Sequence, residues 1–152
     1  MTAQPYPEQR FFEDVEVGEE LERTERFDQE RVERYFEAAK AWGAAARQRD
    51  GRFTNLSEAR RNGLERPMVP GPLSQAMINR MLVAWMGPYG RLHSLDLSFR
   101  RPVLQNDLVH CVILVTDADD DSGLISLDVT LENESGERAV LGTATLELPR
   151  RD

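Results

Sequence analysis

Apolar residues in the first half of the chain recur at helical spacing. In residues 29–42 they return at steps of three and four, which predicts a helix with one buried face. Asp28 stands just before this segment, where a short carboxylate can cap the first N–H groups. A short strand is expected at residues 21–27. The recurring positions are Val32, Tyr35, Phe36, Ala39 and Trp42.

Residues 72–86 form a second, more apolar helical segment after a turn rich in proline and glycine. Their apolar side chains lie almost all round a helix, which predicts a helix enclosed by other structure. Residues 54–63 read as a shorter helix, capped by Thr54 or Asn55 and ended by Gly63. The polar, glycine-broken residues 44–53 predict a loop.

After Gly87 the pattern changes to four β-rich runs separated by turn residues, at residues 91–103, 107–118, 124–134 and 139–149. In residues 124–132 strict alternation places Ile125, Leu127, Val129 and Leu131 on one buried face. The expected product is an antiparallel meander that wraps the helix of residues 72–86. This is an α+β arrangement within a single domain of residues 1–152.

Charge is unevenly distributed along the 152 residues, whose net charge is −8. Residues 40–116 sum to +6, while residues 1–39 and 117–152 sum to −7 each. The total argues against general nucleic-acid binding, and the basic middle suits an anionic ligand, although an unevenly charged solvated surface explains it equally. No run approaches the roughly 18 apolar residues of a membrane helix. A cytoplasmic protein without membrane contact is expected.

The single cysteine and the two histidines carry little evidence of chemistry. Cys111 lies in an apolar strand, which favours a buried structural thiol. His93 is in phase with Leu95 and Leu97 on the face expected to meet the helix, and His110 lies mid-strand. Both are expected to be satisfied core or interface histidines.

Four stretches resemble, in order, the MaoC-like dehydratases and (R)-specific enoyl-CoA hydratases. They are "FFEDVEVGEEL" at 11–21, "NGLERPMVPGPL" at 62–73, "FRRPVLQNDLV" at 99–109 and "GTATLELP" at 142–149. The resemblance implies a hot-dog fold, in which a sheet wraps a long central helix. It also implies addition of water to an enoyl thioester, or its reversal. Coenzyme A or acyl carrier protein would be part of the ligand, with no separate cofactor and no metal.

The family's catalytic groups match this chain only in part. Its oxyanion donor, a backbone N–H at the turn into the central helix, falls on Gly71, with Pro70 at the family's usual histidine. Its aspartate–histidine pair falls on Gln48 and Phe53 by spacing, or on Asp50 and Asn55 with two residues deleted. Neither register supplies a histidine, and asparagine cannot take a proton from water near neutral pH.

Arginines gather where the family's histidine is missing, and guanidinium groups suit the phosphates of a thioester carrier. Ordinary solvated arginines explain them equally. The candidate catalytic residues are therefore Asp50 and Asn55. The candidate substrate-binding residues are Gly71, Pro70, Met68, Trp42, Arg47, Arg49 and Arg52.

The leading interpretation is an acyl-thioester-binding hot-dog protein that lacks the usual catalytic pair and acts as a non-catalytic or partner-dependent subunit. An active lyase that pairs Asp50 with Asn55 or His93 is one alternative. The other alternative is a small-molecule binder or scaffold dimer that does not bind thioesters. A homodimer, or a heterodimer with another hot-dog subunit, is expected because a lone sheet has exposed edges.

Overall fold

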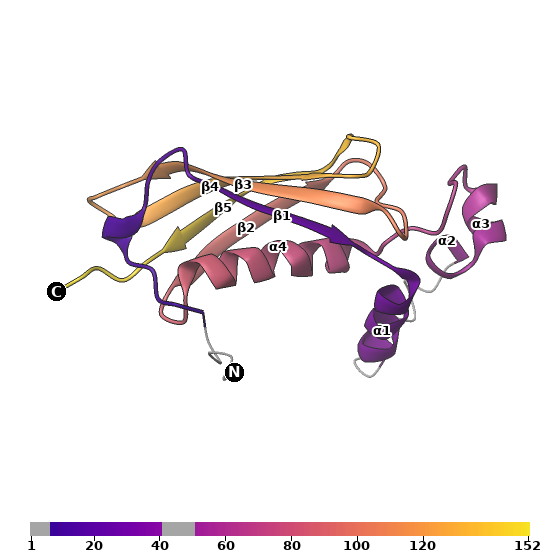
Figure 1. The fold of residues 1–152 in the computed structure, drawn as a ribbon, viewed down its shortest axis with the longest axis horizontal. Helices are drawn as coiled ribbons and strands as arrows, with labels where there is room; N and C mark the ends of the chain where they lie inside the picture. The colour runs from indigo at the N-terminus through magenta and orange to yellow at the C-terminus, as the bar shows by residue number, and fades with distance from the viewer. Residues whose placement is uncertain (1–6, 41–50) are drawn as a thin grey trace.

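The computed structural model describes residues 7–40 and 51–152, and shows an antiparallel sheet with one long helix along its face (Figure 1). The strands are β1 (Glu20–Arg26), β2 (Arg91–Phe99), β3 (Leu108–Ala118), β4 (Leu124–Glu132) and β5 (Arg138–Glu147). The helices are the 3-10 turn η1 (Phe12–Asp14), α1 (Gln29–Lys40), α2 (Gly51–Thr54), α3 (Leu56–Arg61) and α4 (Gly71–Met86).

The buried face of the sheet is the one that alternation predicted. In β4 the side chains of Ile125, Leu127, Val129 and Leu131 are all at most 1% exposed, and the residues between them are more accessible. Ile78 and Leu82 of α4 pack against this face and are fully buried. Burial of these branched and aliphatic side chains against one helix supplies the main apolar stabilisation of the fold.

The order of the strands corrects the expected meander. The sheet runs β1-β3-β4-β5-β2, so β3, β4 and β5 form a meander but β2 pairs with β5 at the far edge. Residues 100–107 are therefore a crossover and not a hairpin turn. The crossover is held by backbone contacts with the turn before α4, including the bridge between Met68 and Leu104. This pairing brings two distant segments together at the beginning of α4.

Helix α4 is buried on one face only, which corrects the expectation of a helix enclosed on most sides. Met77, Ile78, Met81 and Leu82 are at most 6% exposed, whereas Val83 is 46% exposed. A single chain supplies one sheet, and the sheet covers one side of the helix (Figure 1). The opposite side of α4 has no cover within the residues that the structure describes.

Helices α1, α2 and α3 lie at the end of the sheet where α4 begins (Figure 1). Asp28 caps α1 as predicted, because its Oδ1 accepts the Arg31 N–H at 2.8 Å. Asn55 caps α3, and Gly63 follows that helix with a φ of 77°. Residues 51–54 form the short helix α2 where a loop was expected. No helix in the described residues is long and apolar enough to span a bilayer.

Candidate functional site

The turn that leads into α4 is fixed by the crossover of residues 100–107. The Val69 N–H donates to the Val103 carbonyl at 2.7 Å, and the Gln105 N–H donates to the Pro67 carbonyl at 2.8 Å. Arg66 reinforces this pairing, because its Nη1 donates to the Gln105 carbonyl at 2.6 Å. The two segments therefore form one rigid unit, and the first turn of α4 extends directly from it.

An ion pair with one buried partner secures the same unit. Arg66 Nη2 lies 2.7 Å from Asp107 Oδ1, and the side chain of Asp107 is only 5% exposed. The other carboxylate oxygen, Oδ2, accepts the Leu104 N–H at 3.0 Å. Charge-assisted hydrogen bonds of this kind are short and strong, and here they hold the turn and the crossover in one relative position.

Helix α4 begins at Gly71, one residue earlier than the sequence predicted, and Pro70 occupies the N-cap position. Pro70 offers no side-chain acceptor, so the first N–H groups of the helix have no side-chain cap. Phe99 packs closely over Gly71: a Cβ at this position would lie 3.2 Å from Phe99 Cε1. Glycine therefore allows the ring to approach closely, and a larger residue would make the ring shift by a few tenths of an ångström.

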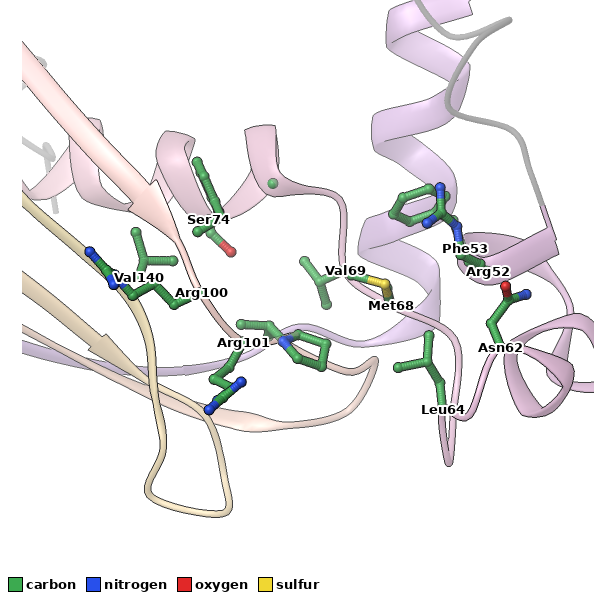
Figure 2. A pocket seen from close by; sticks show the side chains of 14 residues that line it. Arg52, Phe53, Asn62, Leu64, Met68, Val69, Ser74, Arg100, Arg101 and Val140 are labelled. Atoms are coloured by element: carbon green, nitrogen blue, oxygen red, sulfur yellow. The ribbon is translucent and has the colours of Figure 1, made fainter.

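A cavity of about 450 Å³ opens beside Gly71, and we call it the α4 cavity (Figure 2). Its walls are largely apolar and come from the turn, the crossover and the start of β5. Arginine side chains lie around it, and Asn62 and Ser74 add neutral polar groups. The apolar wall includes Met68, Val69, Val103 and Val140, and the arginines are Arg52, Arg100 and Arg101.

The charged side chains in the described lining of the α4 cavity are all arginines. Arg101 lies 3.7 Å from Glu137, a contact in which both side chains are at least half exposed. The guanidinium of Arg52 lies over the ring of Phe53, with its Cζ 5.7 Å from the ring centroid. No carboxylate and no imidazole is among the described residues that line the cavity. The described lining can therefore donate hydrogen bonds to an anion or a carbonyl, but it offers no proton acceptor of suitable basicity.

The structure brings three of the predicted binding residues together, since Gly71, Met68 and Arg52 all line the α4 cavity. Pro70 is buried directly before Gly71. Asp50, Trp42, Arg47 and Arg49 lie outside the described residues, so their predicted roles stay predictions.

Asn55, the second candidate catalytic residue, does not line the α4 cavity. Its Oδ1 accepts the N–H groups of Ser57 and Glu58 at 2.8 and 3.3 Å, which is the capping role that the sequence also predicted. The pairing of Asn55 with Asp50 is a prediction that the described residues leave open.

Neither histidine lies in the core, so of the two expected positions the core is wrong and the interface stays a prediction. His93 is the extra residue of a bulge between Leu92 and Ser94, so the alternation on which its phase was judged is broken there. It is exposed, and its Nε2 lies 2.9 Å from Glu147 Oε2. His110 is partly exposed, with its Nε2 3.5 Å from Glu22 Oε2. Neither imidazole lines the α4 cavity.

Cys111 is the buried structural thiol that the sequence predicted. Its side chain is fully buried in β3, and burial raises the pKa of the thiol to about 12. A thiol with so high a pKa is a poor nucleophile and a poor metal ligand at neutral pH. The described residues contain no cluster of three or more residues suited to hold a metal ion.

Sequence reasoning missed the polar and charged residues on the far walls of the α4 cavity. Arg100 and Arg101 are consecutive and directly follow β2, and such an arginine pair in the sequence could have indicated an anion-binding wall. Ser74 was the other signal, because it is a polar residue on a helix that is otherwise apolar on its buried face. Which wall these residues would face depends on the crossover, which the local pattern did not predict.

The fold and the position of the site together define the hot-dog class, and comparison with solved structures agrees. The (R)-hydratase from A. caviae involved in PHA biosynthesis matches with a TM-score of 0.77 and 24% identity, over 89% of this chain and 98% of that chain. R-hydratase PhaJ1 from Pseudomonas aeruginosa matches with a TM-score of 0.77 and 19% identity, over 96% and 90% of the two chains. The ChsH1-ChsH2 complex from Mycobacterium tuberculosis matches with a TM-score of 0.73 and 22% identity, over 88% and 98%.

No protein-family model matches the sequence, and no curated protein matches it. The chain thus has the hot-dog fold of (R)-hydratases and MaoC-like dehydratases, as its four sequence motifs predicted. At these levels of identity the likeness establishes the fold, and the chemistry must be argued from the residues.

Proposed function

We propose that this chain binds an acyl thioester in the α4 cavity and acts as a non-catalytic or partner-dependent subunit. The observation that carries the proposal is the composition of the cavity. Its described lining combines apolar walls, an uncapped helix N-terminus at Gly71 and three arginines, without a carboxylate or an imidazole. Hydration of an enoyl thioester needs a group that takes a proton from water, and the described lining supplies none.

The orientation of the ligand follows from the polarity of the walls. The thioester carbonyl belongs beside Gly71, where the N–H groups of the first helical turn favour a partly negative oxygen. The acyl group belongs against Val69, Val103 and Val140, which are at most 5% exposed. A volume of about 450 Å³ suits a small-molecule ligand.

The phosphates of the carrier belong with the arginines of the cavity. Coenzyme A carries several phosphates and acyl carrier protein carries one on its prosthetic arm, and guanidinium groups bind both through paired hydrogen bonds. Arg100 and Arg101 follow β2 directly and lie on the cavity wall together (Figure 2). This arrangement supports a carrier-linked acyl group over a free, uncharged small molecule.

A second hot-dog subunit is the partner that the edges of the sheet favour. Strands β1 and β2 lie at the two edges, so each has one side without a strand partner in the described chain. Phe99, at the end of β2, is 51% exposed although it also contacts Gly71. One structural neighbour is a complex of two different chains, which supports either a copy of this chain or a sister subunit as the partner.

Two measurements on the purified chain test the proposal. Crotonyl-CoA and longer trans-2-enoyl-CoA esters are expected to raise the melting temperature, while the absorbance of the conjugated enoyl thioester stays constant. Rapid loss of that absorbance, abolished by Asp50→Asn, would refute the non-catalytic assignment. If no acyl-CoA raises the melting temperature, acyl-thioester binding is refuted and a scaffold dimer is favoured.

A matched pair of variants tests the placement of the carrier phosphates. Arg100→Gln removes a guanidinium from the α4 cavity, whereas Arg91→Gln removes one from the exposed first residue of β2, which does not line it. We expect Arg100→Gln to weaken acyl-CoA binding by about tenfold, the value of one charge-assisted contact. Arg91→Gln should leave binding unchanged. Equal losses in the two variants would show that general charge, and not this wall, attracts the carrier.

A further inference from the structure

The hydroxyl of Ser74 is a polar group in the described lining of the α4 cavity that the proposed function does not yet use. Ser74 lies three residues after Gly71, so the two positions fall on the same face of the helix. The residue is only 2% exposed. Figure 2 shows its hydroxyl pointing away from the helix, into the space between Val69 and Val140.

The Ser74 hydroxyl forms no hydrogen bond to any residue in the described parts of the chain, 7–40 and 51–152. A serine inside a helix often donates to the carbonyl four residues earlier. Here that carbonyl belongs to Pro70, which accepts the Leu73 N–H at 3.0 Å and receives no bond from the Ser74 hydroxyl. The hydroxyl oxygen is not sealed in the core but opens onto the cavity, so water can satisfy it there and a ligand can replace that water.

Ser74 is the polar residue among the buried side chains of α4. The other buried side chains of α4 are apolar: Met77, Ile78, Met81, Leu82 and Met86. Alanine would fill most of the same space without the unpaired oxygen. Because the hydroxyl opens onto the cavity, a ligand in the cavity can satisfy it.

The backbone next to Ser74 presents a second donor. Gly71 is the first residue of α4, and no side chain caps the N–H groups of this turn. Gly71 and Ser74 both line the cavity and Pro72 has no N–H, so the Gly71 amide and the Ser74 hydroxyl are the donors that this face of the first turn can offer to a ligand. A carbonyl oxygen has two lone pairs and accepts two such donors at once.

We propose that Ser74 Oγ donates a hydrogen bond to the carbonyl oxygen of the acyl thioester, beside the bond from the Gly71 N–H. The assignment rests on the proposed function and adds a binding residue to it. Two donors on one oxygen fix the direction of the carbon–oxygen bond as well as its position. The acyl group is thereby aimed along the apolar wall, and the sulfur side is aimed at the arginines.

A pair of ligands isolates the carbonyl. Butyryl-CoA carries the thioester carbonyl, and S-butyl-CoA has a methylene in its place but keeps the same chain and carrier. We expect wild-type protein to bind butyryl-CoA more tightly in calorimetry. Ser74→Ala should weaken butyryl-CoA binding by about three- to tenfold, the range for one hydrogen bond, and leave S-butyl-CoA unchanged. Ser74→Cys carries an S–H group, which is a weak donor, so its affinity for butyryl-CoA should lie between those of wild type and Ser74→Ala.

Controls separate this assignment from folding and from the proposed function. Ser94→Ala removes an exposed hydroxyl from β2, outside the cavity lining, and should change neither affinity. Ser74→Ala should unfold at about the same denaturant concentration as wild type, because the hydroxyl bonds to no residue in the described parts of the chain. An equal loss of affinity for both ligands, or no loss for either, overturns the role of Ser74 alone. Wild-type protein that binds neither ligand overturns the proposed function and this assignment with it.

Discussion

Removing Arg66 and removing Asp107 from their ion pair should lower the free energy of unfolding by different amounts. Arg66→Met leaves the Asp107 carboxylate, which is 5% exposed, with the Leu104 N–H as its remaining partner. Asp107→Asn leaves a guanidinium that is 36% exposed and that water can still reach. The first change strands a buried charge, and the second strands one that is partly solvated. Arg66→Met should therefore be the more destabilising variant.

The magnitudes follow from the burial of the group left behind. Breaking a buried pair costs about 3–5 kcal/mol, and the surviving Leu104 bond places Arg66→Met near the lower value, about 3 kcal/mol. Asp107→Asn loses charge assistance but keeps an acceptor, so after allowance for solvent it should cost about 1.5 kcal/mol. For a chain of 152 residues, Arg66→Met corresponds to a fall in melting temperature on the order of 6–12 °C.

Urea unfolding followed by circular dichroism measures both free energies. Arg61→Met is the matched control, because Arg61 pairs with Glu58 at 2.5 Å on the surface, where the side chains are 74% and 42% exposed. The control should stay within about 0.5 kcal/mol of wild type. If Asp107→Asn cost as much as Arg66→Met, or Arg66→Met matched the control, the assignment of burial as the cause would be wrong.

Three further outcomes are expected. Asn55→Ala should lower the free energy of unfolding by about 1 kcal/mol through loss of the α3 cap, without changing affinity in the α4 cavity; altered acyl-CoA affinity would count against a purely capping role. Cys111 should react with a thiol reagent only after denaturation, since burial raises its pKa to about 12, and labelling of the folded protein would contradict the burial. Gly142→Ala should destabilise by about 3 kcal/mol or more, because its Cβ would lie 2.0 Å from the Asp96 carbonyl oxygen of β2; Gly136→Ala, with open space around it but a φ of 76°, should cost clearly less in the same unfolding assay.

The local pattern predicted individual elements well because each depends on short-range physics. The buried face of β4 could be read from alternation, since Ile125 and Leu131 must face the same side of any sheet. The Asp28 cap and the turn at Gly63 could be read for a similar reason, because capping and positive φ act over a few residues. The four motifs also predicted the hot-dog fold.

The order of strands and the walls of the site could not be read in the same way. The pairing of β2 with β5 depends on how residues 100–107 pack against the turn before α4, an interaction between segments far apart in the sequence. The bulge at His93 reversed its expected orientation, and alternation alone gives no warning of a bulge. Ser74 acquires its position only when β5 and the crossover close the cavity around it.

The crossover makes any subunit that docks on β2 a direct neighbour of the ligand. Phe99 ends the edge strand and contacts Gly71, and Arg100 and Arg101 continue from it into the cavity wall. A shift of the β2 edge by a docked chain would travel through these three consecutive residues to the carbonyl end of the cavity. Assembly could then adjust affinity without contributing a single side chain to the pocket.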